Sequence, residues 1–169
     1  NPRFNLAMEQ YLFEEAPYKG PWFLLWQNDN AIIVGRNQNT AAELDGEYTR
    51  ARGIQVVRRT TGGGAVYHDL GNLNFTLIAD GRSSEELDLH LFCQPVAAAL
   101  KRLGVPVEVS GRNDMLIGGK KFSGNSQRIW RGRVLHHGTL LFDSDLTVLS
   151  SALRVPPDKL LQKGVASVR

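Results

Sequence analysis

Hydrophobic side chains recur every three to four positions in two stretches of the chain, and this spacing predicts two amphipathic helices. The first is expected to begin at Asn1-Pro2, because asparagine caps a helix well and proline suits the first turn. The second is expected from a capping box at residues 83–86 to a glycine at position 104. Phe4, Ala7, Tyr11 and Glu14 recur at helical spacing in the first helix, Glu9 lies beside this apolar stripe, and the flanking face consists of Leu6, Gln10 and Phe13.

Short apolar or alternating runs predict strands through the middle of the chain. Residues 22–26 and 31–34 are apolar and are joined by N-D-N, which predicts a β-hairpin. Residues 72–78 alternate between polar and apolar side chains, so their polar face would line a ligand site or face water. Further strands are expected at residues 54–58, 105–109, 115–117 and 133–142, and short helices at residues 43–52, 145–153 and 156–162.

A run of three glycines follows the predicted strand at residues 54–58, in the sequence R-R-T-T-G-G-G. Glycine lets a ligand approach the main chain, and successive N–H groups in such a loop favour an anion. Arg58 and Arg59 add positive charge in a fork geometry that matches phosphate. The run therefore predicts a phosphate-binding loop, with a flexible turn in a β-rich protein as the alternative.

The common nucleotide and metal motifs are absent from the sequence. The run G-K-K at residues 119–121 lacks the hydroxyl residue of a P-loop, and Tyr67 stands where the dinucleotide motif needs its last glycine. No Cys/His spacing predicts a structural zinc site. His136 and His137 are adjacent, so on a strand they would point to opposite faces.

A second cationic feature is Lys121, which follows a glycine-flanked bend. Such a lysine would donate to a phosphate and a carboxylate oxygen together, and would offset their repulsion when a carboxylate attacks the α-phosphate of ATP. Asp114 is a candidate to hold Mg²⁺ on the phosphates. The alternative for Lys121 is an ordinary solvated lysine.

Composition narrows the function classes. The 169 residues suit one domain, and 42% hydrophobic residues with 22% charged residues are ordinary for a soluble globular protein. The net charge of +3 comes from scattered basic residues, which favours an anionic ligand or acidic partner over nucleic acid. No apolar run approaches the length of a membrane span. Cys93 is the one cysteine, so a reducing compartment, the cytoplasm, is expected, and its place in a helix predicts a buried thiol.

An ordered set of motifs resembles the lipoate–protein ligase family. R-R-T-T-G-G-G-A-V-Y-H-D-L-G-N-L-N-F is followed by G-R-N-D, G-K-K-F-S-G and H-H-G-T-L-L. N-L-A-M-E-Q, V-G-R-N-Q-N and K-G-V-A-S-V also fit, so the resemblance covers essentially the whole chain. It implies an α/β (α+β) fold shared with biotin–protein ligases, with a mixed, largely antiparallel sheet flanked by helices. Residues 1–169 are then expected to be a catalytic domain that continues beyond Arg169, with or without a small C-terminal accessory domain.

The resemblance implies a two-step reaction. Lipoate, or octanoate, and MgATP would give the acyl-adenylate, and the acyl group would then pass to a lysine of an E2 lipoyl domain or of glycine-cleavage H protein. Lys121 is implied as the catalytic residue that contacts both substrates. The residues implied for ATP or the adenylate are Arg59, Gly62, Gly63, Gly64, Ala65, Val66, Tyr67, Asn72 and Asp114. Those implied for lipoate are Glu9, Thr61, His68, Ser123, Arg128 and His137.

Three other functions remain alternatives. Octanoyltransferases of the same fold need a cysteine nucleophile and no ATP, but residues 111–114 contain no cysteine and Cys93 lies within a predicted helix. Biotin–protein ligases carry a differently patterned arginine-rich loop. A non-catalytic module that binds a lipoyl group or nucleotide predicts that Lys121→Ala keeps the fold and changes only the affinity. ATP-dependent pyrophosphate release with free lipoate distinguishes the ligase from the octanoyltransferase, and competition between biotin and lipoate for adenylation distinguishes it from the biotin–protein ligase.

Overall fold

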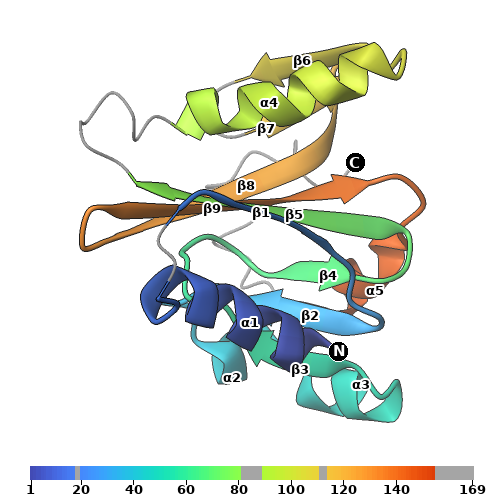
Figure 1. The fold of residues 1–169 in the computed structure, drawn as a ribbon. Coiled ribbons are helices and arrows are strands. Elements are labelled where there is room, and N and C mark those ends of the chain that lie inside the picture. The colour runs from blue at the N-terminus through green and yellow to red at the C-terminus, as the bar shows by residue number, and fades with distance from the viewer. Residues whose placement is uncertain (18–19, 81–88, 111–113, 155–169) are drawn as a thin grey trace.

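The computed structural model describes residues 1–17, 20–80, 89–110 and 114–154. Its largest element is a six-stranded antiparallel sheet with strand order β1-β5-β9-β8-β7-β6 (Figure 1). The strands of this large sheet, in that order, are Trp22–Trp26, Asn72–Asp80, Arg133–Leu141, Lys120–Trp130, Asp114–Ile117 and Val107–Ser110.

A small three-stranded sheet lies below the large one in Figure 1. Its central strand β2 (Ala31–Val34) pairs in parallel with β3 (Gln55–Arg58) and antiparallel with β4 (Val66–His68). The predicted hairpin between residues 22–26 and 31–34 is therefore wrong, because β1 pairs with β5 and β2 belongs to the other sheet. The local apolar pattern marks both strands correctly but carries no information about their partners.

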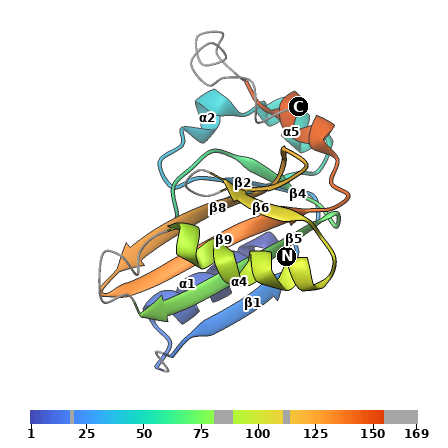
Figure 2. The same ribbon diagram turned by 90° about the horizontal axis from the view of Figure 1, so that it is seen from above.

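Helices cover the two sheets (Figures 1 and 2). Helix α4 (Leu89–Arg102) lies on the outer face of the large sheet, and α1 (Pro2–Glu14) packs against strands of both sheets. The small sheet is covered on its outer side by α3 (Gly46–Ala51) and α5 (Leu146–Ala152), and α2 (Thr40–Glu43) precedes α3. The short helix predicted at residues 43–52 is confirmed as α3, but it starts later than predicted, because Leu44 and Asp45 divide α2 from α3.

Helix α1 begins as predicted, but it buries a different face. The Asn1 side chain accepts hydrogen bonds from the backbone N–H groups of residues 3 and 4, and Pro2 occupies the first turn. The buried residues are Pro2, Leu6, Glu9 and Phe13. Phe4 and Tyr11, which were predicted to face the core, are 65% and 54% exposed. Packing against the two sheets selects the face that brings Glu9 inside.

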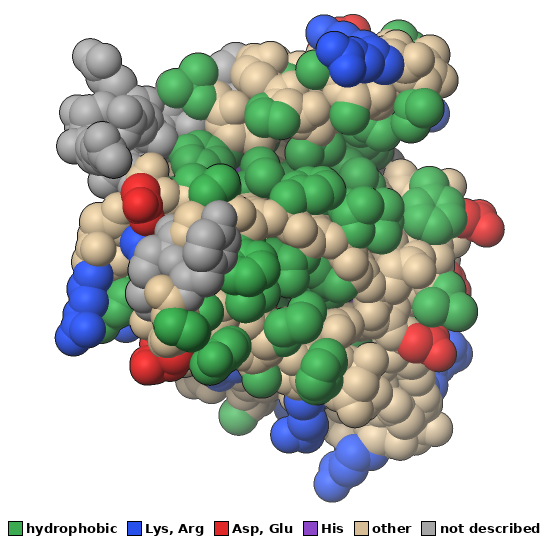
Figure 3. Space-filling view, in the orientation of Figure 1, with side chains coloured by type: hydrophobic (Ala, Val, Ile, Leu, Met, Phe, Trp, Pro, Cys, Tyr) green, Lys and Arg blue, Asp and Glu red, His purple; other side chains and the backbone are tan. Residues whose placement is uncertain are grey.

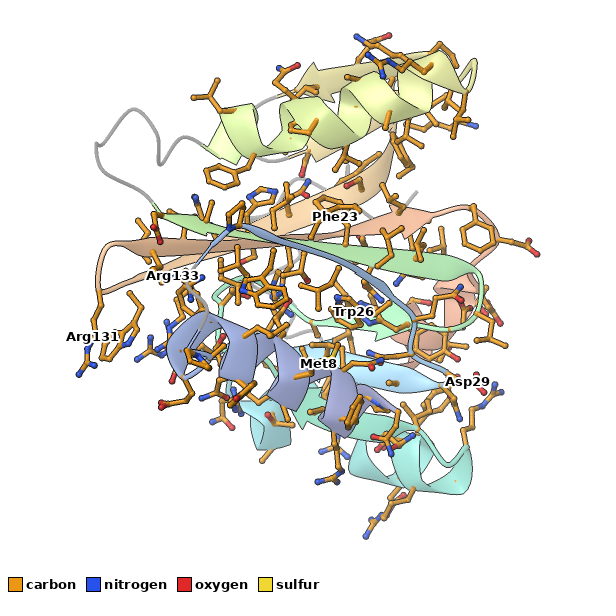
Figure 4. All side chains as sticks on the ribbon, in the orientation of Figure 1. Met8, Phe23, Trp26, Asp29, Arg131 and Arg133 are labelled. Atoms are coloured by element: carbon orange, nitrogen blue, oxygen red, sulfur yellow. The ribbon has the colours of Figure 1, made fainter. Side chains whose placement is uncertain are left out.

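Three apolar layers hold the fold together. Phe75, Cys93 and Met115 pack between α4 and the large sheet. Leu6, Trp26 and Ile33 belong to a cluster that fills the space between the two sheets beside α1, and further residues pack under α3 and α5. Figure 4 shows Trp26 of β1 directed toward the small sheet and Phe23 of the same strand on the opposite side, toward α4. The alternation of β1 thus supplies side chains to two different layers.

Two surface features complete the fold. Hydrophobic side chains gather over β1 and below α4 in Figure 3, where Phe23 and Leu25 are more than half exposed. At the start of β9, Arg133 donates to the Leu12 and Phe13 carbonyl oxygens at 3.0 and 2.7 Å and so caps the last turn of α1. No helix in the described ranges is long and apolar enough to cross a bilayer. The predictions for residues 83–86 and 156–162 lie outside the described residues.

Candidate active site

The polar face of β5 lies inside the molecule. Asn72, Asn74 and Thr76 are at most 1% exposed. The Asn72 side-chain amide donates to Oδ1 of Asn74 at 3.0 Å, and Asn74 donates in turn to the Trp26 carbonyl oxygen at 3.2 Å. Of the two possibilities that the sequence left open, exposure to water is therefore excluded. The face belongs to the layer between the two sheets, which also contains the predicted site residues Glu9, His68 and His137.

Glu9 connects this face to the glycine loop through buried hydrogen bonds. Its Oε1 accepts from the Thr76 hydroxyl at 2.6 Å and lies 2.9 Å from Nδ1 of His137. Because a carboxylate can only accept, Nδ1 of His137 carries the hydrogen. The other ring nitrogen of His137 lies 2.8 Å from the Thr61 hydroxyl. The structure thus brings Glu9, Thr61 and His137, three of the residues predicted for the lipoate pocket, into direct contact.

Arg59 lies inside the glycine loop and not at its edge. Its side chain is buried, and its guanidinium donates to the carbonyl oxygens of Ile33, Gly62 and Gly64 at 2.7–3.0 Å. Burial lowers the pKa of Arg59 to about 10, against the opposing effect of Glu9, so the group stays charged at neutral pH. The donors of Arg59 are directed at the protein's own carbonyl groups, so Arg59 shapes the glycine loop, and its contact with a phosphate stays a prediction.

In the glycine loop, carbonyl groups are hydrogen-bonded to the protein, whereas the N–H groups have no partner among the described residues. The Gly62 carbonyl oxygen accepts from Arg59 and, at 3.0 Å, from the Ser126 hydroxyl of β8. Within the described part of the chain, none of the backbone N–H groups of Gly62, Gly63 and Gly64 has a hydrogen-bond partner. Gly63 adopts φ +94°, a conformation that favours glycine. An anion-binding loop requires backbone N–H groups that are available to donate, and here the hydrogen-bonded carbonyl groups fix the loop that presents them.

The residues after the glycine loop divide between two layers. Val66 packs with the cluster between the sheets, whereas Ala65 and Tyr67 pack on the outer side of the small sheet. The Tyr67 hydroxyl donates to Oδ1 of Asn30 at 3.2 Å. Of this predicted segment, the side chains of Ala65 and Tyr67 therefore point away from the shared layer.

His68 is a neutral, buried histidine. Its Nδ1 accepts from the Asn28 side-chain amide at 3.1 Å, so the hydrogen is on Nε2, which has no partner among the described residues. Burial, followed by the charges of His137 and Arg59, lowers the pKa of His68 to about 3. The ring packs edge-on against Trp26. His68 is thus an uncharged hydrogen-bond donor in the layer between the sheets.

A β-bulge in β8 next to Lys121 determines which face of the strand the Lys121 side chain occupies. Met115 pairs with Ser123, but the next residue of β7, Leu116, pairs with Lys121, so Phe122 is an extra residue. This bulge changes the alternation, and Lys121 thereby shares the face of Gly124. A Cβ on Gly124 would lie 3.4 Å from Cε of Lys121. On that face Nζ of Lys121 forms an ion pair with Asp114 at 2.8 Å, and both side chains are about one-third exposed.

Two other predicted lipoate residues have different surroundings. Ser123 is fully buried and pairs with Met115, whose side chain belongs to the cluster under α4. Ser123 therefore lies on the face opposite to Lys121. Arg128 forms an ion pair with Glu14 of α1 and stacks on the Phe13 and Trp130 rings. The structure does not bring either residue into the network of Glu9, Thr61 and His137.

Sequence reasoning missed Asn28 and Trp26. Asn28 stands in the polar N-D-N run that was interpreted as a turn, yet it is 1% exposed and orients His68. The Trp26 ring nitrogen donates to the Thr76 hydroxyl at 2.9 Å and so completes the Glu9 network. No local signal distinguishes these two from an ordinary loop asparagine and core tryptophan.

Comparison with known proteins identifies the family to which the chain is similar. The model of the lipoyl protein ligase A/B catalytic domain matches residues 1–169. Lipoate-protein ligase LplJ of Bacillus subtilis (strain 168) is 46% identical over 169 residues, which make up 100% of this chain and 51% of that protein. A lipoate-protein ligase 1 of Staphylococcus aureus (strain Mu50) is also 46% identical, with 100% and 52% covered. The chain thus spans about half the length of the curated relatives it matches.

Solved structures agree with the sequence comparisons. A crystal structure of lipoate-protein ligase A bound with ATP matches with a TM-score of 0.82 and 31% identity, covering 92% of this chain and 68% of that one. The match and the observed architecture confirm the predicted mixed, largely antiparallel α+β fold. The motifs, the fold and these matches together show that the chain belongs to the lipoyl protein ligase A/B catalytic domain family.

Proposed function

We propose that the protein activates lipoate with ATP to form lipoyl-adenylate and then transfers the lipoyl group to a lysine of an acceptor protein. The observation that carries the proposal is the glycine loop: the N–H groups of Gly62, Gly63 and Gly64 have no partner among the described residues, while the carbonyl groups of Gly62 and Gly64 accept from Arg59. Such a loop stabilises a phosphate and the charge that develops on it. The ATP bound to the similar lipoate-protein ligase A agrees with this assignment.

Lys121 is proposed to act where the two substrates meet. In the first step a lipoate carboxylate oxygen attacks the α-phosphorus of ATP, and pyrophosphate leaves. The two anions repel each other, and an ammonium group between them lowers the barrier. The side chain of Lys121 is one-third exposed. It lies on the same face of β8 as Ser126, whose hydroxyl donates to the Gly62 carbonyl oxygen of the glycine loop. Its ion pair with Asp114 holds the ammonium group near the sheet until substrate anions replace or share that partner.

The layer between the sheets is proposed to receive lipoate. Its polar atoms are largely paired, but Nε2 of His68 and Oδ1 of Asn72 have no partner among the described residues. A buried polar group without a partner is costly, and a bound substrate or water would satisfy it. A protected location also suits the acyl-adenylate, because that intermediate reacts with water.

Asp114 is proposed to contribute to a Mg²⁺ site. Mg²⁺ takes oxygen ligands and is commonly held by one or two carboxylates together with substrate phosphates. Among the described residues no group of three or more His, Cys, Asp or Glu side chains gathers to hold a metal by itself. The single carboxylate of Asp114 beside Lys121 fits an ion held largely by the nucleotide. When bound, such an ion would neutralise charge on the phosphates.

Acceptor proteins are proposed by analogy with the relatives. A bi-partite lipoate protein ligase of Thermoplasma acidophilum, studied with its E2 lipoyl domain, matches with a TM-score of 0.86 at 32% identity, covering 95% of this chain and 64% of that one. E2 lipoyl domains, and glycine-cleavage H protein as a second class, are therefore the proposed acceptors. We place the reaction in the cytoplasm, in keeping with the single cysteine.

The rival octanoyltransferase reaction lacks a suitable nucleophile in the described chain. Cys93 is 0% exposed, and its sulfur lies 4.0 Å from Nε2 of His136 in the layer under α4. That layer is separated from the glycine loop by the large sheet. A substrate carbonyl would have to enter the apolar core to reach this thiol.

Pyrophosphate release tests the proposal. With ATP, Mg²⁺ and lipoate, the protein should release pyrophosphate, and Lys121→Ala should lower this rate by about 10²-fold or more, because the charge on the transition state loses its partner. Lys120→Ala is the matched control, since Lys120 is an exposed neighbour that is expected to leave the rate unchanged. Acyl transfer from octanoyl-carrier protein without ATP, or full activity of Lys121→Ala, would contradict the proposal.

A further inference from the structure

The short loop at residues 35–38, beside the glycine loop, is held by backbone hydrogen bonds and close packing. The Arg36 N–H donates to the Thr61 carbonyl oxygen at 2.8 Å, and the Gly35 N–H donates to the Gln38 side chain at 2.7 Å. A Cβ on Gly35 would lie 2.1 Å from the Gly63 carbonyl oxygen, so only glycine permits this approach. The loop that carries Arg36 is therefore in van der Waals contact with the glycine loop.

Arg58 fastens the same loop from the other side. Its guanidinium donates to the carbonyl oxygens of Gly35, Arg36 and Gln38 at 2.7–3.2 Å, and to the Thr40 hydroxyl at 2.7 Å. Arg58, like Arg59, thus uses its donors on the protein itself. Neither arginine of the R-R-T-T-G-G-G motif presents a free guanidinium to a ligand in this structure.

The side chain of Arg36 differs from those of Arg58 and Arg59, whose donors are used within the protein. It is exposed, and in the described part of the chain no hydrogen bond or ion pair involves its guanidinium. A fixed backbone with a free cationic side chain is the arrangement expected of a ligand-binding residue, because binding then orders only the side chain. The guanidinium fork also matches phosphate oxygens better than it matches most other anions.

We propose that Arg36 binds the β- and γ-phosphates of ATP at the outer edge of the glycine loop. This inference rests on the proposed adenylation reaction and concerns its leaving group. When the lipoate carboxylate oxygen bonds to the α-phosphorus, the bond to the bridging oxygen breaks and pyrophosphate takes the electron pair. A cation beside that group stabilises the charge that it gains. Arg36 therefore serves adenylation, whereas the later attack of the acceptor lysine, which releases AMP, does not need it.

The test separates the two half-reactions in the full-length protein. Arg36→Gln should raise the KM for ATP by about tenfold or more, the usual effect of losing a charge-assisted hydrogen bond, while the KM for lipoate stays the same. Arg36→Lys should recover part of the loss. Transfer of the lipoyl group from preformed lipoyl-adenylate to an apo E2 lipoyl domain should proceed at the wild-type rate. Arg102→Gln, which removes an exposed arginine from α4 on the far side of the large sheet, is the matched control and should change neither step.

Two results would overturn the inference. One is an unchanged KM for ATP in Arg36→Gln. The other is a defect confined to the KM for the acceptor domain, which would make Arg36 a docking residue for an acidic protein. Wild-type protein that releases no pyrophosphate from ATP and lipoate would instead refute the proposed function itself. Because the side chain of Arg36 is exposed and forms no hydrogen bond or ion pair with the described residues, the variants are expected to fold, and circular dichroism checks this.

Discussion

The two neighbouring histidines of β9 show how a one-residue shift decides the chemistry of a side chain. His137 faces the layer between the sheets and bonds to Glu9 and Thr61. His136 faces α4 and stacks between Phe75 and Phe92, with ring centroids 6.0 and 5.3 Å away. Burial, followed by the charge of His137, lowers the pKa of His136 to about 3. The prediction from the sequence that the two rings face opposite sides is confirmed.

His136 should make the stability of the protein depend on pH. Its pKa is about 3 in the folded state and about 6.5 in the unfolded chain, so between these values only the unfolded chain binds the proton. The free energy of unfolding should therefore fall as the pH decreases from about 6.5 toward 3, by up to roughly 1.4 kcal/mol per pH unit for this group. Its contribution is fully present above pH 6.5.

The variant His136→Phe isolates this effect. Phenylalanine retains the stacking and cannot titrate, so urea unfolding at pH 7.5, 6 and 5 should show a shallower decline than in the wild type. His68, with a similarly lowered pKa, would account for part of the slope that remains. An identical pH dependence in the two proteins would mean that His136 is not buried in its neutral form.

At the scale of the element, the final positions of the site residues depend on short irregular segments more than on the regular strands. The bulge at Phe122 turns Lys121 to the face of Gly124. The loop at Gly35 contacts the glycine loop through a carbonyl oxygen that leaves no room for a side chain. In both places the strand delivers the chain to the site, and an extra residue or a missing Cβ then sets the final geometry.

Gly35→Ala tests the contact between the two loops. The added methyl group would meet the Gly63 carbonyl oxygen at 2.1 Å, and moving this backbone should cost about 1–3 kcal/mol of unfolding free energy. The KM for ATP should also rise, because the glycine loop shifts with it. Gly46→Ala is the control, since nothing lies within 4 Å of its added Cβ and alanine suits a helix. Equal stability of the two variants would show that the loops separate readily.

At the scale of the whole molecule, one buried polar network joins parts that are distant in sequence. Glu9 comes from α1, Thr76 and His137 from the large sheet, and Thr61 from the glycine loop beside the small sheet. Because buried polar groups that lose their partners are penalised, the network stabilises only one relative arrangement of these parts. This arrangement also connects the layer proposed for lipoate to the loop proposed for ATP.

Removing the Glu9 carboxylate should lower the stability of the whole fold, because this group joins α1 to the large sheet. Glu9→Ala leaves Thr76 and His137 without their shared acceptor and should lower the free energy of unfolding by about 2–4 kcal/mol. Glu15→Ala removes an exposed carboxylate at the end of the same helix and should change it by less than about 0.5 kcal/mol. Thermal unfolding of the two variants measures the difference. A small effect of Glu9→Ala would indicate that water replaces the carboxylate without loss.

Much of the fold and some of the site could be predicted from local patterns. Alternation marked β5, the Asn1-Pro2 cap marked the start of α1, and the glycine run marked the loop whose N–H groups have no partner among the described residues. Strand partners were beyond reach, because the hydrophobic pattern of β1 is equally compatible with pairing to β2 or to β5. The site residues Asn28 and Trp26 were missed because nothing near them in the sequence indicates that they become neighbours of His68.

The sequence by itself determined the backbone tendencies, because helix period, strand alternation and glycine content depend on residues a few positions apart. Only the tertiary structure decided which face of α1 is buried, that Arg58 and Arg59 are occupied by carbonyl groups, and that Arg36 is left free. These outcomes depend on contacts between segments far apart in the chain. The positive charge of an arginine can be read from its letter, but the groups that its donors reach are set by the packing of the whole molecule.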